Sequence, residues 1–99
     1  MSFRVRFTLA AKADLERLYG FLLEHDVEAA ERALDVIDRA WSILEEFPFS
    51  CRKAEDSNPF VREIVIPFGP AGYVALFEIE DQQTVTVLAV RHQREDDYH

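Results

Sequence analysis

The chain has 99 residues, 48% of them hydrophobic, which is typical of one globular domain with a modest core. No apolar run approaches the ~20 residues of a membrane-spanning helix, and the charges near the start of the chain argue against a signal peptide. The net charge of −8 disfavours general binding to nucleic acid, because phosphates attract cations.

The chain opens with a predicted strand. Residues 3–8, FRVRFT, alternate apolar side chains with basic or polar ones, which gives one buried face and one basic face. Thr8 is the predicted N-cap of a following helix, because its hydroxyl can accept a hydrogen bond from an otherwise unpaired backbone N–H. This strand must join a sheet that is completed later in the chain.

Two helices follow. Apolar residues recur at helical spacing over residues 10–25, with Asp14 among the polar side chains outside the apolar stripe. Asp26 is the predicted N-cap of the second helix, which runs to about Phe47 and is ended by Pro48. Its apolar seam consists of Ala30, Leu34, Ile37, Trp41 and Leu44. The tight break between the helices predicts an antiparallel hairpin that packs on a sheet.

The second half of the chain is predicted to be a meander. Residues 49–59 lack periodicity and are rich in turn formers, which predicts a loop. Strands are predicted at residues 60–66, 72–79 and 84–91. The predicted fold is therefore α+β, β-α-α-β-β-β, with an antiparallel helical hairpin on one face of a mainly antiparallel four-stranded sheet. A single domain spans residues 1–99.

The sequence suggests no metal or disulfide chemistry. The lone cysteine, Cys51, cannot form an intramolecular disulfide and fits a reducing cytoplasm, where we expect the protein and its structural thiol. No set of His, Cys, Asp and Glu has metal-ligand spacing, so we expect no metal and no cofactor. His25 and His99 are assigned no role.

Polar groups follow directly where the last predicted strand ends. Residues 84–90 are apolar on both faces, which predicts a central strand. Arg91, His92, Gln93 and Arg94 come next, at a place that is both rigid and accessible. We expect the working surface there, with Arg52, Lys53 and Arg62 as further basic residues that could converge on it.

Five short motifs occur in order along nearly the whole chain. They are AxxDL (residues 11–15), LxxxP (44–48), VREI (61–64), GYVALFEI (72–79) and VRHQRxDxY (90–98). Their order and spacing resemble the RelE/ParE superfamily of toxins from bacterial type II toxin–antitoxin systems, and in particular its ParE-like, plasmid-stabilisation branch. The fold implied by this resemblance agrees with the predicted order of elements.

The resemblance implies one of two activities. ParE-like members bind DNA gyrase and poison it without covalent chemistry, whereas RelE-like members cut messenger RNA on the ribosome. Both are held inactive by a cognate antitoxin. For this chain the resemblance favours a non-enzymatic gyrase inhibitor with a ParD-like antitoxin. The expected target-binding residues are Arg52, Lys53, Arg62, Arg91, His92 and Arg94.

A nuclease is the alternative activity. Cleavage of RNA needs a base, an acid and cations around the reacting phosphate, and Arg62, Arg91, His92 and Tyr98 could supply them. Some of these residues, and the tail that follows them, also have a structural interpretation. Arg62 could pair with Glu63 or Glu78, His92 could hydrogen-bond the backbone at the sheet end, and residues 94–97 could be a solvated tail.

A partner surface is expected on the sheet. The last three strands are apolar on both faces, but two helices can cover only one face. The remaining apolar surface predicts an antitoxin segment or a second copy of the chain in a homodimer. A third alternative is a toxin fold without toxicity that acts as an interaction module. We expect no membrane association and no direct sequence-specific binding to nucleic acid.

Overall fold

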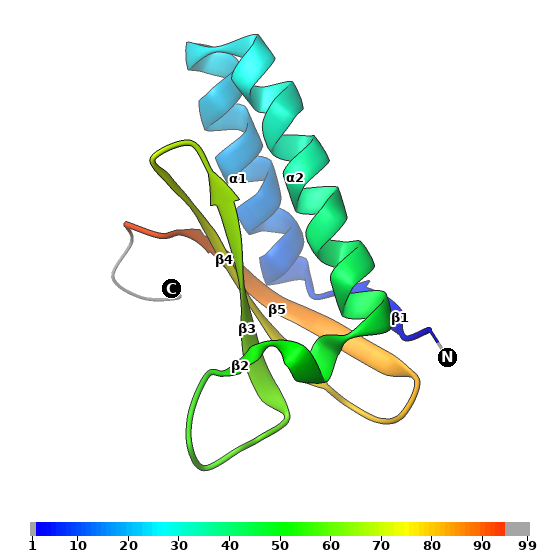
Figure 1. The fold of residues 1–99 in the computed structure, drawn as a ribbon. Coiled ribbons are helices and arrows are strands. Elements are labelled where there is room, and N and C mark those ends of the chain that lie inside the picture. The colour runs from blue at the N-terminus through cyan, green and yellow to red at the C-terminus, as the bar shows by residue number, and fades with distance from the viewer. Residues whose placement is uncertain (1, 95–99) are drawn as a thin grey trace.

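The computed structural model describes residues 2–94, which form an α+β fold with the predicted order of the main elements (Figure 1). In chain order these are β1 (Arg4–Phe7), α1 (Leu9–His25), α2 (Val27–Glu46), the 3₁₀ turn η1 (Pro48–Ser50), β2 (Arg52–Lys53), β3 (Val61–Phe68), β4 (Ala71–Ile79) and β5 (Thr84–His92). The sheet order is β1-β5-β4-β3-β2, with β1 parallel to β5 and the other pairs antiparallel.

The sheet has five strands where the sequence predicted four. The additional strand is β2, which lies inside the segment predicted to be a loop. Arg52 and Lys53 pair there with Glu63 and Arg62 of β3. Two residues cannot show a period of two, so a strand this short is created by its partner rather than by its own pattern.

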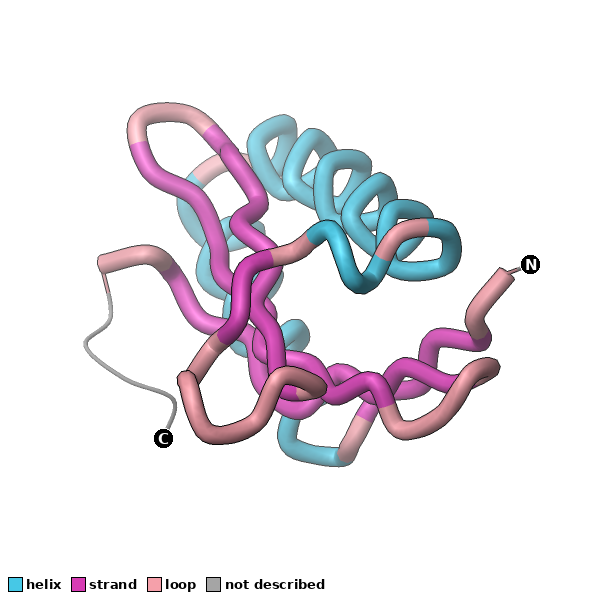
Figure 2. Tube along the Cα trace, turned by 60° about the horizontal axis from the view of Figure 1, so that its bottom comes forward, coloured by secondary structure: helices cyan, strands magenta, loops and turns pink. Residues whose placement is uncertain are grey.

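Both helices pack on the same face of the twisted sheet, as predicted (Figure 2). The core between the layers is formed by Leu18, Ile37 and Leu44 from the helices and by Ile64, Phe77, Val85, Val87 and Val90 from the strands. Neither helix is long and apolar enough to cross a membrane.

Both predicted helix caps are confirmed. The Thr8 hydroxyl accepts a hydrogen bond from the Ala11 N–H at 3.0 Å, and the Asp26 carboxylate accepts one from the Ala29 N–H at 3.1 Å. Each cap satisfies one of the N–H groups that the first turn of a helix leaves unpaired. Asp26 also ends α1, since its own N–H donates to the Leu22 carbonyl at 2.7 Å.

The predicted seam of α2 was wrong at one position. Leu34 is 42% exposed, while Ala33 and Ala40 are buried. The helix therefore approaches the sheet through small side chains, which rotates the contact away from Leu34. Trp41 is half-buried at the edge of the seam, where its ring meets Phe7 edge-on at 5.1 Å.

Asp14 was predicted outside the apolar stripe, and this prediction was also wrong. Its side chain is 2% exposed, and its Oδ2 accepts a hydrogen bond from the Val90 N–H at 2.9 Å. The reason is that β1 ends at Phe7, while β5 continues past it. Thr8 and Asp14 take over the backbone groups of β5 that β1 leaves unpaired, since the Thr8 hydroxyl also donates to the Leu88 carbonyl at 3.0 Å.

The turn between β3 and β4 is shorter than the predicted turn at residues 67–72. Both strands extend into that range, and Gly69 makes the turn with a φ of 61°, which favours glycine. Gly72 lies within β4 opposite Pro67, and a Cβ at this position would overlap the Ile66 carbonyl oxygen. A close approach of backbones therefore requires glycine here.

Candidate functional site

The residues predicted to bind a target fall into separate groups. Arg52, Lys53 and Arg62 lie at the β2–β3 edge, whereas Arg91, His92 and Arg94 lie at and just beyond the end of β5. Strand β4 runs between the two groups. Tyr98, the further nuclease candidate, lies outside the described residues.

The sheet register keeps these groups apart. Arg62 is opposite Phe77 of β4, and Arg91 is opposite Val74 of the same strand. Three residues along a strand span roughly 10 Å, and two strand spacings span roughly 10 Å across the sheet. Arg62 shares the helix-covered face with Ile64, while Arg91 shares the opposite face with Val74. The two arginines do not belong to one site.

A β-bulge decides which polar side chain faces which way. Phe77 pairs with Val87 and Leu76 pairs with Ala89, so Leu88 is an extra residue in β5. A bulge reverses the alternation of faces beyond it. His92 therefore lies on the helix-covered face opposite Tyr73, and Arg91 lies on the other face.

Arg62 is held by the backbone rather than by the predicted acids. Its guanidinium donates to the carbonyl oxygens of Pro59, Phe49 and Cys51 at 2.8, 3.1 and 2.7 Å. It also lies 5.3 Å from the centre of the Phe49 ring, in cation–π contact. The side chain therefore ties the segment that contains η1 and β2 to strand β3, where the expected partners were Glu63 and Glu78.

The neighbouring cations differ in their partners. Arg52 donates through Nε to Glu63 Oε1 at 3.1 Å, which closes the β2–β3 pair with an ion pair. Lys53 is exposed, lies opposite Arg62, and makes no ion pair within residues 2–94. Of the three, Lys53 is thus the one that can meet a partner without giving up a contact in the fold.

Cys51 is not an activated thiol. Burial raises its pKa above the ordinary value, and the nearby Arg62 guanidinium and a hydrogen bond with Ser50 offset this only in part. The nucleophile in cysteine chemistry is the thiolate. A thiol with a raised pKa is mostly protonated at neutral pH, which agrees with the structural role expected for Cys51.

His92 has a defined tautomer. Its Nδ1 accepts a hydrogen bond from the Arg94 N–H at 3.1 Å, so in the neutral ring the proton is on Nε2. The imidazole meets the ring of Tyr73 edge-on at 5.8 Å. The structural alternative for this residue, a backbone hydrogen bond at the sheet end, is therefore present.

A pocket of about 240 Å³ adjoins His92. Its wall combines the aromatic rings of Phe21, Phe68 and Tyr73 with the side chains of His92 and Arg94. Burial raises the pKa of Tyr73, which keeps its phenol neutral. Such a wall can hold an apolar group, and the Arg94 guanidinium beside it can attract an anion.

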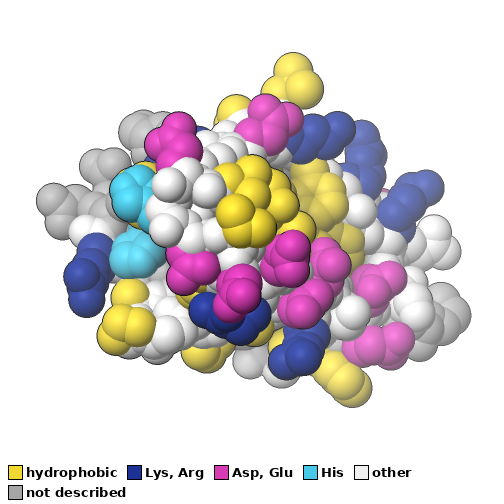
Figure 3. Space-filling view, turned by 90° about the horizontal axis from the view of Figure 1, so that it is seen from above, with side chains coloured by type: hydrophobic (Ala, Val, Ile, Leu, Met, Phe, Trp, Pro, Cys, Tyr) yellow, Lys and Arg dark blue, Asp and Glu magenta, His cyan; other side chains and the backbone are white. Residues whose placement is uncertain are grey.

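Sequence reasoning passed over His25. Its ring stacks on Phe21 with 4.3 Å between centres, and Phe21 lines the pocket that adjoins His92. Figure 3 shows imidazole side chains on one side of this view from above, with apolar side chains nearby. The available signal was the spacing of four residues between Phe21 and His25, which puts them on one face of α1.

Within the described residues, the metal-ligating side chains do not cluster and the nuclease candidates lie apart. Within residues 2–94, no three His, Cys, Asp or Glu side chains lie together where they could hold a metal ion. Of the nuclease candidates in that part of the chain, His92 is separated from Arg62 by strand β4 and from Arg91 by the plane of the sheet. The arrangement is better suited to binding than to phosphoryl chemistry, which needs its groups around one phosphate.

Comparison with known proteins shows the family to which the chain belongs. Toxin RelE1 of Caulobacter vibrioides is 37% identical over 79 residues, covering 80% of this chain and 82% of that protein. Toxin RelE3 of the same organism is 31% identical over 86 residues, covering 86% and 88%. A chromosomal ParDE toxin–antitoxin system from P. aeruginosa has the same fold, with a TM-score of 0.70 at 18% identity over 92% of this chain and 96% of that one. A model of the ParE toxin of the type II toxin–antitoxin system parDE matches residues 5–97, and the chain therefore belongs to the ParE toxin family.

Proposed function

We propose that this toxin inhibits DNA gyrase by binding it, without covalent chemistry of its own, and that a ParD-like antitoxin neutralises it. Membership of a toxin–antitoxin family implies an antitoxin partner. The observation that carries the choice of target is the dispersal of the candidate catalytic groups. Arg62 is tied to three carbonyl oxygens, and Arg91 faces away from His92 across the sheet.

The net charge of the chain also supports gyrase rather than the ribosome as the target. A ribosome-dependent nuclease must approach dense ribosomal RNA, and a chain with a net charge of −8 is repelled at long range. A gyrase inhibitor needs only a complementary protein surface. The candidate contacts for gyrase are the six basic and imidazole residues predicted from the sequence, and among them Arg52, Lys53 and Arg94 are exposed.

The antitoxin would meet a smaller apolar face than the sequence predicted. On the sheet face away from the helices, Val74 and Ala89 are almost fully buried, whereas Val65 is 40% exposed. Other exposed apolar residues of the described chain lie beside the sheet rather than on it, and include Leu34 and Ile43 of α2. Val65 and Ile43 line one groove between β3 and α2, which is the surface we assign to the antitoxin or, alternatively, to a second copy of the chain.

Induced expression without antitoxin, with pulse labelling of DNA and protein synthesis, tests the target. We expect DNA synthesis to stop first, together with the SOS response, and purified protein to block supercoiling by gyrase in vitro. Intact supercoiling at excess toxin would contradict the proposal. Normal growth with soluble protein would indicate an interaction module that has lost toxicity.

A ribosome-dependent mRNA endonuclease is the second candidate, because the two curated relatives carry the name RelE. Its sign would be an early stop in translation, with cuts in messenger RNA that disappear in His92→Ala. Lys53→Ala should then weaken cleavage through lost phosphate contact. Arg62→Ala is a poor test by itself, since it also removes hydrogen bonds that hold the fold.

A further inference from the structure

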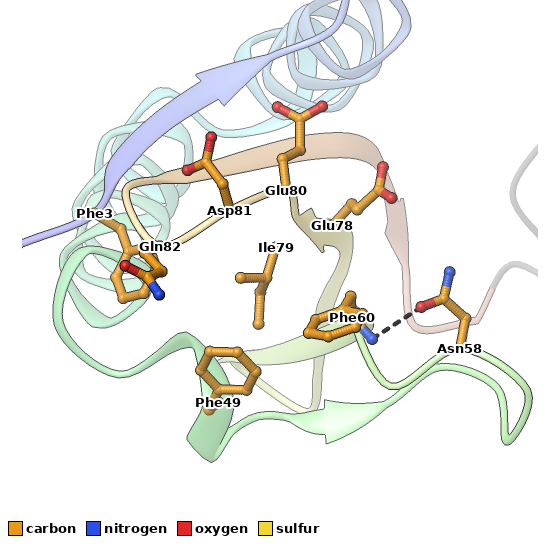
Figure 4. A pocket seen from close by; sticks show the side chains of 9 residues that line it. All are labelled: Phe3, Phe49, Asn58, Phe60, Glu78, Ile79, Glu80, Asp81 and Gln82. Atoms are coloured by element: carbon orange, nitrogen blue, oxygen red, sulfur yellow. Dashed lines mark hydrogen bonds between the residues drawn. The ribbon is translucent and has the colours of Figure 1, made fainter.

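A further pocket is lined by none of the residues considered so far as target contacts, although Arg62 contacts Phe49 of its wall. It has a volume of about 480 Å³ and lies between the start of the chain, η1, the start of β3 and the β4–β5 turn. Its apolar wall consists of Phe3, Phe49, Phe60 and Ile79, and its acidic rim consists of Glu78, Glu80 and Asp81. Figure 4 shows the rings gathered around Ile79, with the three carboxylates along the opposite side.

The aromatic wall is exposed to a degree that folding alone does not explain. Phe49 and Phe60 are 52% and 50% exposed, although their rings contact each other edge-on with 6.4 Å between centres. Contiguous exposed aromatic surface on a small protein usually marks an interaction site, and aromatic side chains contribute most of the binding energy at such sites.

The wall is also fixed in place before any partner arrives. Arg62 holds Phe49 through its carbonyl and its ring. The Phe60 N–H donates to Asn58 Oδ1 at 3.0 Å, a bond drawn in Figure 4, and the Phe60 carbonyl accepts from the Ile79 N–H at 2.8 Å. The Phe3 N–H donates to the Glu45 carbonyl at 2.7 Å. A preformed pocket loses little conformational entropy on binding.

The acidic rim determines the charge of the group that this pocket can bind. Three of the described lining residues are acids, and none is Lys or Arg. Nucleic acid and other anions are therefore excluded. Two of the carboxylates are engaged within their own hairpin, since Glu80 accepts from the Thr86 hydroxyl at 2.6 Å and Asp81 accepts from the Gln83 N–H at 2.8 Å. The carboxylates therefore supply negative potential rather than the convergent hydrogen bonds that orient a small molecule.

We propose that this aromatic–acidic pocket docks a segment of a partner protein that presents a bulky apolar side chain next to a Lys or Arg. The apolar side chain fills the hollow over Ile79, and the cation lies against the rim. The inference does not depend on whether gyrase or the ribosome is the target, because the pocket uses none of the six residues assigned to target binding.

Selection of heptapeptides from a random phage-displayed library on the immobilised 99-residue chain tests the proposal. We expect enrichment of sequences in which Trp, Phe or Leu adjoins Lys or Arg. Binding of the enriched peptide should perturb the amide resonances of Phe49, Phe60 and Ile79 in NMR spectra. Acidic or purely polar enriched sequences would overturn the proposal, and so would perturbations confined to the pocket beside His92.

Matched variants separate the two parts of the site. Phe49→Ser should weaken the enriched peptide at least tenfold, while Phe47→Ser, an exposed phenylalanine outside the pocket, should change it less than about twofold. The pair Glu78→Gln with Asp81→Asn should weaken it about threefold or more at low salt and less at high salt. Glu55→Gln with Asp56→Asn makes the same charge change on exposed residues elsewhere and should leave affinity unchanged. Equal affinity for all four variants would overturn the proposal, as would loss of self-association rather than of peptide binding in Phe49→Ser.

Discussion

The two flanks of the sheet end in different ways, and the difference separates what holds this fold from what remains available to a partner. Both edge strands are short, with four residues in β1 and two in β2. On the β1 side, which we call the closed flank, side chains of Thr8 and Asp14 accept or donate the hydrogen bonds of the part of β5 that extends beyond β1. On the β2 side, which we call the open flank, no strand of the described chain pairs with the outer edge of β3 beyond Glu63.

A proline limits how far the open flank can pair with a further strand. The Ala54 N–H donates to the Val61 carbonyl, so the odd-numbered residues of β3 direct their backbone groups outward. Pro67 is at one of these positions and has no N–H to offer. A proline on an edge limits its pairing with further strands. The flank is therefore accessible to a partner over a short length around Val65.

Replacing Asp14 on the closed flank should have the largest effect on the stability of the fold. Asp14→Ala leaves the buried Val90 N–H without an acceptor, and we expect a loss of about 2–3 kcal/mol in the free energy of unfolding. Asp14→Asn, which keeps an oxygen acceptor, should lose less. Urea unfolding measures both variants. Glu16→Ala, an exposed acid two residues along the same helix, is the control, and an equal loss there would contradict the role of Asp14.

The closed flank also shows the limit of reading this sequence. The order of elements and both helix caps were predictable because they depend on local patterns within residues 3–48 and 60–91. Asp14 was not, because its partner Val90 lies 76 residues further along the chain. A carboxylate on a helix next to apolar neighbours has the pattern of a solvated residue unless the strand beside it is known.

The candidate site was predictable in its residue types and not in its geometry. Polar residues at the end of β5 were identified correctly, but the extra residue Leu88 reverses the faces that follow it. A bulge in a strand of apolar residues leaves no sign in the sequence, so the sequence did not show which of Arg91 and His92 lies on the helix-covered face. An acid partner was the structural alternative considered for Arg62, and the carbonyl oxygens of the segment at residues 49–59 hold it instead.

The second largest effect is expected at the β2 end of the open flank. Arg62→Ala should lower the free energy of unfolding by about 1–2 kcal/mol, because it removes the hydrogen bonds that fasten this segment to β3. Lys53→Ala should change it by less than about 0.5 kcal/mol. Equal losses in the two variants, measured by urea unfolding, would mean that Arg62 has no structural role.

The rate at which Cys51 is alkylated shows whether the segment that contains η1 and β2 is released from β3 in Arg62→Ala. The Arg62 guanidinium lowers the pKa of the Cys51 thiol, so losing the charge alone would raise the pKa and slow alkylation by iodoacetamide. Release of the segment would instead remove the burial that raises the pKa, and alkylation would become faster. We expect faster alkylation in Arg62→Ala than in the wild-type chain at pH 8, and slower alkylation would show that the segment stays in place.

Thr8→Ala should have a smaller effect, of about 1 kcal/mol, because a helix cap and the bond to the Leu88 carbonyl are lost while the backbone bond from the Thr8 N–H to the Val87 carbonyl remains. Thr8→Ser keeps the hydroxyl and should retain most of the stability. Combined with Asp14→Ala, the losses should not add, since both residues complete the same stretch of β5. Strict additivity in thermal or urea unfolding would argue that the two side chains act independently.

The smallest effect on stability is expected at Val65, which is exposed on the open flank. Val65→Thr keeps a branched side chain suited to a strand on a residue that is 40% exposed, and we expect a change in stability below about 0.5 kcal/mol. The same replacement at the fully buried Val90 of the closed flank should cost about 2 kcal/mol, because it buries a hydroxyl in the core. Amide hydrogen exchange gives a second comparison, with early exchange at Val65 and late exchange at Val90. A cost at Val65 similar to that at Val90 would mean that β3 is as tightly closed as β5, and the groove between β3 and α2 would then have to be abandoned as the surface for the antitoxin.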